Sequence, residues 1–155
     1  MSIRSAAKVI LLWDGKVLVN RCCRDDGSTY FDLPGGGQKL FESLEEAAIR
    51  EVKEETGCPI SIVRFAALAE EIQSNPGVRA EYPDYSHRIL HIFLARLSEA
   101  PREVPTEPDT GMVESLWLTP GEIARIHDFF PPTLPAHLEE ILETSGAVWL
   151  GTTRP

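Results

Sequence analysis

Residues 33–58 carry the sequence LPGGGQKLFESLEEAAIREVKEETGC, in which a glycine-rich turn precedes an acidic, helix-like stretch. The three consecutive glycines, Gly35 to Gly37, are incompatible with regular helix and let the backbone pass close to another group. Ser43 and Glu46 have the spacing of a capping box, and Gly57 is placed to end a helix in the left-handed conformation. The pattern predicts a helix that begins at Ser43 and ends before Gly57.

The charge pattern of this helix is unusual. At 100° per residue, its apolar face consists of Leu44, Ala47, Ala48 and Val52. Glu51 and Glu55 fall within that face and Glu54 falls at its edge, close to the helix C-terminus, where negative charge is unfavourable. Arg50 and Lys53 are expected on the opposite side, where they do not neutralise all three glutamates.

A divalent cation would balance these charges, and carboxylate ligands suit Mg²⁺ or Mn²⁺. The alternative is an exposed acidic helix end that binds nothing, since acidic helix faces are common. The glycine-rich turn directly before the helix favours the metal site, because it offers carbonyl oxygens and open space beside the carboxylates.

The remaining sequence predicts a mixed sheet flanked by helices. Asp14-Gly15 is a strong two-residue hairpin signal between two β-rich runs. The predicted strands are residues 8–13, 16–21, 60–72, 88–97 and 112–118. Helices are expected from Pro120, capped by Thr119, and over residues 134–144, whereas 73–86 and 100–111 are expected to be loops. This order of elements predicts an α+β fold, formed by residues 1–155 as a single domain.

Composition excludes several classes of protein. The net charge of −9 would repel a nucleic acid polymer, and no basic stripe offsets it. No apolar run is long enough to span a membrane. The three cysteines, an odd number without regular spacing, argue against a disulfide framework. These features lead us to expect a cytoplasmic protein without a membrane or nucleic acid partner.

The segment resembles the Nudix box, written G-x5-E-x7-R-E-U-x-E-E-x-G-U, where U is a bulky aliphatic residue. The corresponding residues are Gly36, Glu42, Arg50, Glu51, Val52, Glu54, Glu55, Gly57 and Cys58. Only Cys58 departs from the pattern, and a buried cysteine behaves as a small hydrophobe. The resemblance to the Nudix hydrolase family extends over most of the chain and implies the Nudix fold, an α/β/α sandwich around a mixed β-sheet.

The resemblance also implies a metal centre and a reaction. Glu51, Glu54 and Glu55 would hold Mg²⁺, with Mn²⁺ as a substitute, and the Gly35 carbonyl is a further candidate ligand. The implied reaction is hydrolysis of a phosphoanhydride bond in a nucleoside diphosphate derivative. Water would attack phosphorus in line and release a phosphate monoester.

Other residues are expected to support this chemistry. Glu42, Arg50 and Gly36 would brace the turn against the helix and orient the carboxylates. The general base is left open between Glu54, Glu55 and, from outside the box, Glu114. The candidate substrate contacts are Arg21, Arg88, Tyr82 and Tyr85, with His87 and His91 as weaker candidates.

Two other functions remain possible on the same fold. One is a regulator that binds a nucleotide or metabolite without hydrolysing it. The other is a prenyl diphosphate isomerase, whose acid/base pair usually includes a cysteine, for which Cys22 and Cys23 are the candidates. The complete set of box carboxylates favours a hydrolase. A homodimer is a further expectation, because dimers are common in the family.

Overall fold

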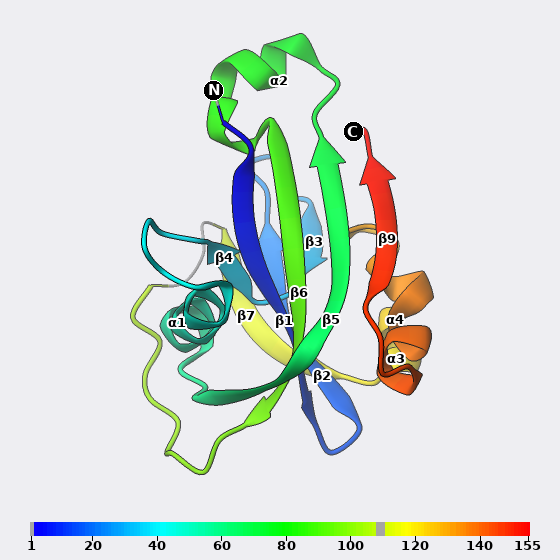
Figure 1. Ribbon diagram of the computed structural model, residues 1–155. Helices are drawn as coiled ribbons and strands as arrows, with labels where there is room; N and C mark the ends of the chain where they lie inside the picture. Colours follow the sequence, from blue (N-terminus) through cyan, green and yellow to red (C-terminus); the bar gives the residue numbers. More distant parts are fainter. Residues whose placement is uncertain (1, 108–110) are drawn as a thin grey trace.

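The strands of the protein form one mixed sheet in a computed structural model that describes residues 2–107 and 111–155 (Figure 1). The strands are β1 (Arg4–Trp13), β2 (Lys16–Cys23), β3 (Thr29–Asp32), β4 (Gly35–Gly37), β5 (Ile60–Ile72), β6 (His87–Leu97), β7 (Met112–Leu118), β8 (Phe129–Phe130) and β9 (Val148–Thr153). The helices are α1 (Leu44–Thr56), α2 (Pro76–Glu81), α3 (Pro120–Ile123) and α4 (Leu134–Glu143), with a 3-10 turn η1 (Pro83–Tyr85).

The sheet has the strand order β8-β3-β2-β1-β6-β5-β9, with β4 beside β1 and β7 beside β2. The central strand β1 is parallel to β6 and antiparallel to β2 and β4. Mixed strand directions confirm the predicted α+β class. The arrangement also brings the glycine strand β4 directly alongside β1, so that Gly35 lies opposite Lys8 and Gly37 lies opposite Ala6.

Each face of the sheet carries its own core. Because side chains alternate along a strand, Val9 and Leu11 of β1 pack on the α1 side, whereas Ile10 packs on the opposite side. Helix α1 covers the first face, and α3 and α4 cover the second (Figure 1). The predicted α/β/α sandwich is therefore confirmed.

Helix α1 forms for the reasons visible in the sequence. The Ser43 side chain accepts a hydrogen bond from the Glu46 amide at 3.2 Å, and the Glu46 carboxylate accepts one from the Ser43 amide at 2.7 Å. Gly57 ends the helix with φ of 70°, and its amide donates to the Lys53 carbonyl. The Asp14-Gly15 hairpin also forms, with both residues at positive φ.

Several parts of the fold differ from the sequence-based expectation. Strand β1 begins at Arg4, four residues before the predicted start, and β2 ends at Cys23, two residues after the predicted end. Residues 73–86, expected to be a loop, contain α2 and η1, because the Asn75 side chain caps α2 through the Gly77 amide at 2.8 Å. The short strands β3, β4 and β8 and the edge strand β9 were not predicted, since they depend on pairing with distant strands. Helix α4 ends at Glu143 rather than Thr144. Residues 108–110 of the predicted loop 100–111 lie outside the described residues.

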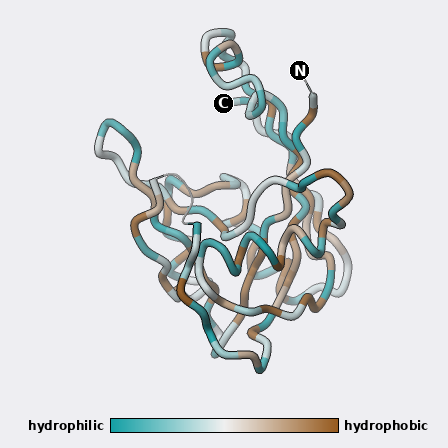
Figure 2. The backbone as a smooth tube through the Cα atoms, turned by 90° about the vertical axis from the view of Figure 1, so that its left-hand side faces the viewer, coloured by the Kyte–Doolittle hydropathy of each residue, from teal (hydrophilic) through white to brown (hydrophobic). Residues whose placement is uncertain are grey.

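The α2 segment projects beyond the rest of the chain, near both chain ends (Figure 2). Its base is attached to the C-terminal residue, because the Ser74 amide donates to the Pro155 carbonyl at 2.7 Å. Within the described residues, no helix is both long enough and apolar enough to cross a membrane.

Candidate active site

Glu55 lies at the centre of the site and is only 3% exposed. Its Oε2 atom accepts hydrogen bonds from the Asn20 side-chain amide at 3.0 Å and from the Gly35 backbone amide at 3.1 Å. A carboxylate on the apolar face of α1 is therefore satisfied by β2 and β4, which lie beneath that face. The helix packs its acidic end directly onto the glycine-rich strand.

Asn20 was not singled out from the sequence, although it is an amide that directly follows the apolar run Val17–Val19. It is 2% exposed, and its Oδ1 atom accepts a hydrogen bond from the Ser115 hydroxyl at 2.9 Å. Ser115 lies on β7, opposite Asn20 in the strand register. Two neighbouring strands thus fix the orientation of the amide that donates to Glu55.

Arg50 joins the glycine strand, the following loop and the acidic helix end. Its guanidinium donates to Glu42 at 2.6 and 2.9 Å and to the Gly37 carbonyl at 3.0 Å. It also donates to Glu51 at 2.6 Å and to Glu54 at 3.1 Å. Arg50 was expected on the opposite side of the helix, but its side chain reaches two of the three glutamates, Glu51 and Glu54.

This network changes the acidity of its members. Hydrogen bonds from the Arg50 guanidinium lower the pKa of Glu42 to about 2, against the opposing effect of burial. The same pair of bonds raises the pKa of Arg50 further above its ordinary value. Glu42 is therefore ionised over the whole physiological pH range.

Gly36 is required by the close approach of Glu51. A Cβ atom at Gly36 would lie 2.4 Å from the Glu51 Oε2 atom, so any side chain there would displace the carboxylate. At Gly35, φ is 130° and a Cβ atom would lie 2.2 Å from the Ala7 carbonyl oxygen. Both glycines let the turn lie against β1 and α1 at the same time.

The donor set fits a hard divalent cation. Glu51, Glu54 and Glu55 offer only oxygen ligands from adjacent turns of one helix, and the bare backbone of Gly36 leaves the Glu51 carboxylate room. In the arrangement of residues 2–107 and 111–155, no three acidic, histidine or cysteine side chains already converge on one point. Arg50 supplies the counter-charge to Glu51 and Glu54 in this arrangement.

The Gly35 carbonyl, a predicted ligand, accepts a hydrogen bond from the buried Lys8 ammonium at 3.1 Å. Lys8 also donates to Asp32 at 2.8 Å and to the Leu33 carbonyl at 3.1 Å. This buried ion pair between β1 and β3 was not predicted. The sequence indicates the pair only through the presence of two charged residues, Lys8 and Asp32, within strands.

Arg21 and Glu114 lie opposite one another on β2 and β7 and form a partly exposed ion pair at 2.8 Å. Each was predicted separately, Arg21 as a phosphate contact and Glu114 as a general base. In the structure these two residues contact each other. Among the described residues, neither forms an ion pair with Glu51 or Glu54, which are paired with Arg50.

The remaining predicted contact residues lie in the first half of β6 and in the segment directly before it. Arg88 forms an ion pair with Glu71 and lies 4.4 Å from the centre of the Phe130 ring, lining a cavity of about 550 Å³. Tyr85 lies against the guanidinium of Arg88, with 5.6 Å between the guanidinium carbon and the ring centre, and Tyr82 is half-exposed. His87 forms a 2.8 Å contact with Glu70, and His91 approaches the Ala6 carbonyl at 3.3 Å.

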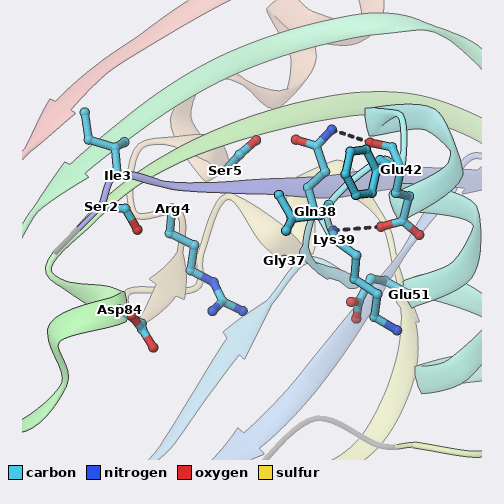
Figure 3. A pocket seen from close by; sticks show the side chains of 12 residues that line it. Ser2, Ile3, Arg4, Ser5, Gly37, Gln38, Lys39, Glu42, Glu51 and Asp84 are labelled. Carbon is cyan, nitrogen blue, oxygen red and sulfur yellow. Dashed lines mark hydrogen bonds between the residues drawn. The ribbon is translucent and has the colours of Figure 1, made fainter.

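A second cavity of about 690 Å³ lies beside the box (Figure 3). Glu42 and Glu51 line it on one side, with Gly37 and Lys39 from the same turn. The start of β1 contributes the opposite side, where Arg4 extends towards Gly37. Open space and both signs of charge therefore lie next to the predicted metal ligands.

Comparison with known proteins agrees with this arrangement. A sequence model described as the NUDIX domain matches residues 3–140. The chain therefore belongs to the Nudix family, as the box residues predict. Membership of this hydrolase family also bears out the expectation of an enzyme.

Solved structures share the fold. A NUDIX hydrolase from Nitrosomonas europaea has a TM-score of 0.71 at 20% identity, covering 100% of this chain and 81% of its own. A MutT protein from Bacillus halodurans has a TM-score of 0.66 at 19% identity, with coverages of 98% and 90%. An ADP-ribose pyrophosphatase from Streptococcus suis has a TM-score of 0.62 at 17% identity, with coverages of 96% and 99%. At these identities the likeness shows the fold alone.

Proposed function

We propose that the protein is a hydrolase that depends on a divalent cation and cleaves a phosphoanhydride bond in a nucleoside diphosphate derivative. Mg²⁺ is the proposed cation, and Mn²⁺ is expected to substitute for it. The observation that carries this proposal is the position of Glu55. It is a buried carboxylate held by Asn20 and Gly35, on the same helix as Glu54 and as Glu51, which lines an open cavity.

The side chains of the site have different proposed roles. A bound cation supplies positive charge to the diphosphate and lowers the pKa of the attacking water. Glu55 is held in one orientation by two hydrogen bonds, while Arg50 orients Glu51 and Glu54. We assign the proton of the attacking water to Glu54, because its side chain is 23% exposed and is the most accessible of the three.

The experiment is an assay with Mg²⁺ and then Mn²⁺ against a panel of diphosphate compounds, with products separated by mass. The panel contains nucleoside triphosphates, ADP-ribose, uridine diphosphate derivatives, dinucleotides and prenyl diphosphates. ADP-ribose and the uridine compounds are included because two proteins of similar fold are named ADP-ribose pyrophosphatase and UDP-X diphosphatase. A metal-dependent phosphate monoester product is expected.

Glu55→Gln tests the role of the site in the same assay. We expect turnover to fall by orders of magnitude, because the amide cannot supply the negative charge that the cation requires. Glu45→Gln is the matched control, since Glu45 is exposed near the start of the same helix and should leave turnover unchanged. An isomerised product of unchanged mass, or binding of a nucleotide without cleavage, would replace the hydrolase proposal with one of its two alternatives.

A further inference from the structure

Arg4, the first residue of β1, differs from the other arginines near the site. Arg21, Arg24, Arg50 and Arg88 each form an ion pair with a carboxylate. Among residues 2–107 and 111–155, no carboxylate lies within ion-pair distance of the half-buried Arg4 guanidinium. Arg4 is therefore a cation close to the site that forms no ion pair among the described residues, although three carboxylates, those of Glu42, Glu51 and Asp84, line the same cavity.

The guanidinium of Arg4 is nevertheless held in place. It lies over the Tyr85 ring, with 4.7 Å between its central carbon and the ring centre. On its other side it approaches the backbone of Gly37, where a Cβ atom would lie 2.5 Å from the Arg4 Nη2 atom. The missing side chain of Gly37 therefore leaves the space that the guanidinium occupies.

The position of Arg4 relates it to the predicted metal ligands. It lines the cavity of about 690 Å³ that Glu51 also lines, and it points towards Gly37 in the close-up view (Figure 3). Lys39 adds a second positive charge to this lining. A guanidinium stacked on a ring keeps its N–H edge available, and that edge matches two oxygens of a phosphate.

We propose that Arg4 binds a phosphate group of the substrate in this cavity, with Tyr85 as the residue that positions the guanidinium. This inference rests on the proposed function, because it concerns the substrate of the same site. It assigns Tyr85 a positioning role, whereas the sequence indicates Tyr85 as a candidate for direct contact with the substrate. Phosphates held by a cation at Glu51 would then face Arg4 across the cavity.

Binding of methylenediphosphonate tests the inference without requiring catalysis, because this diphosphate analogue cannot be hydrolysed. Its affinity would be measured by calorimetry in the presence of Mg²⁺. We expect Arg4→Gln to weaken binding about tenfold to a hundredfold, as for loss of a charged hydrogen-bonding pair. Arg4→Lys should recover part of the affinity, since it keeps the charge and loses the planar edge, and Tyr85→Leu should cause a smaller loss.

Arg96→Gln is the matched control. Arg96 is exposed on β6 opposite Leu12, at the far end of the strand pair that begins with Arg4 and Arg88. The Arg96→Gln substitution removes the same charge from the chain and should leave the affinity for methylenediphosphonate within about twofold of wild type. Equal affinity of Arg4→Gln and wild type would overturn the inference, and so would absence of binding by wild type.

Kinetics separate this inference from the proposed function. If the wild-type protein hydrolyses a substrate, Arg4→Gln should raise KM for it with a much smaller change in kcat. Hydrolysis with an unchanged KM and unchanged analogue binding would leave the function standing and remove Arg4 from it. Analogue binding that depends on Arg4, without hydrolysis of any substrate, would retain the phosphate site and reject the hydrolase.

Discussion

Arg50 illustrates how much of the site depends on single side chains. One guanidinium contacts Glu42, Glu51 and Glu54, which come from the turn and from the helix. Each contact alone is ordinary, but together they set the position of α1 relative to β4. The consequences can be measured separately from catalysis, because the ionisation of Glu42 is linked to folding.

Glu42→Gln should change the pH dependence of stability. Since the pKa of Glu42 is lowered from 4.5 to about 2, the unfolded state takes up the proton first as the pH falls. The contribution of the pair is present above pH 4.5 and is lost as the pH falls towards about 2. The free energy of unfolding, measured by denaturant titration from pH 6 downwards, should fall less steeply in Glu42→Gln than in wild type. Equal slopes would show that the ion pair is not linked to folding.

Asn20→Ala should weaken both stability and turnover. The substitution removes a donor from the buried Glu55 carboxylate, which costs about 1–3 kcal/mol, and frees the carboxylate to reorient. An outer partner of this kind typically changes metal affinity or activity by about tenfold to a hundredfold. Urea titration and steady-state kinetics would measure the two effects. Ser115→Ala, one hydrogen bond further away, should have a smaller effect on both, and the reverse order would contradict the assignment.

At the scale of elements, the C-terminus of α1 is attached to the segment that follows β6. The amides of Thr106 and Glu107 both donate to the Glu54 carbonyl, at 2.9 and 3.0 Å. The Glu103 amide donates to the Gly57 carbonyl at 2.8 Å. These bonds satisfy acceptors that a helix end leaves unpaired, and they hold the turn of α1 that carries the acidic side chains.

Gly57→Ala should therefore cost more stability than Gly15→Ala. Both glycines have φ near 70°, where an alanine costs roughly 1–2 kcal/mol. At Gly57 a Cβ atom would also lie 1.8 Å from the Glu103 carbonyl oxygen, whereas at Gly15 nothing lies within 4 Å. Thermal unfolding of the two variants separates backbone strain from the close contact. Equal losses would show that the segment around Glu103 moves away without cost.

Features that depend on interactions between neighbouring residues in the sequence were predicted, whereas features that depend on contacts between distant parts of the chain were not. Helix α1 and the first hairpin were predicted because Ser43, Gly57 and Asp14-Gly15 act on their own neighbours. The glycine strand β4 was not predicted, because only its pairing with β1 makes it a strand. Residues recognisable by the Nudix box were identified in advance, whereas Asn20, Lys8 and Arg4 act through contacts with distant parts of the chain.

At the scale of the molecule, the sheet separates two cores that share the same strands. Ile10 and Leu11 are consecutive residues of β1, both fully buried, and they face opposite sides. One core supports α1 and hence the site, while the other supports α3 and α4. Because the strands β1, β2, β5 and β6 contribute residues to both cores, we expect the two cores to unfold together.

Ile10→Ala and Leu11→Ala form a matched pair for this expectation. Each should lower the free energy of unfolding by about 2–5 kcal/mol, since each deletes a buried aliphatic side chain. In both variants, circular dichroism and tryptophan fluorescence should follow one coincident transition in denaturant. A variant in which the two signals separate would show that the cores unfold independently.

The segment that follows β6 also bears on how this family member can diverge. Residues 103, 106 and 107 are attached to α1 through their main-chain amides, which every amino acid except proline provides. Mutational drift at these three positions is therefore compatible with the attachment as long as proline is avoided. The end of α1 is thus held by main-chain bonds that tolerate many side chains, and of these three positions, within the described part of the chain, only Glu103 also forms an ion pair with the helix, through Lys53 at 3.1 Å.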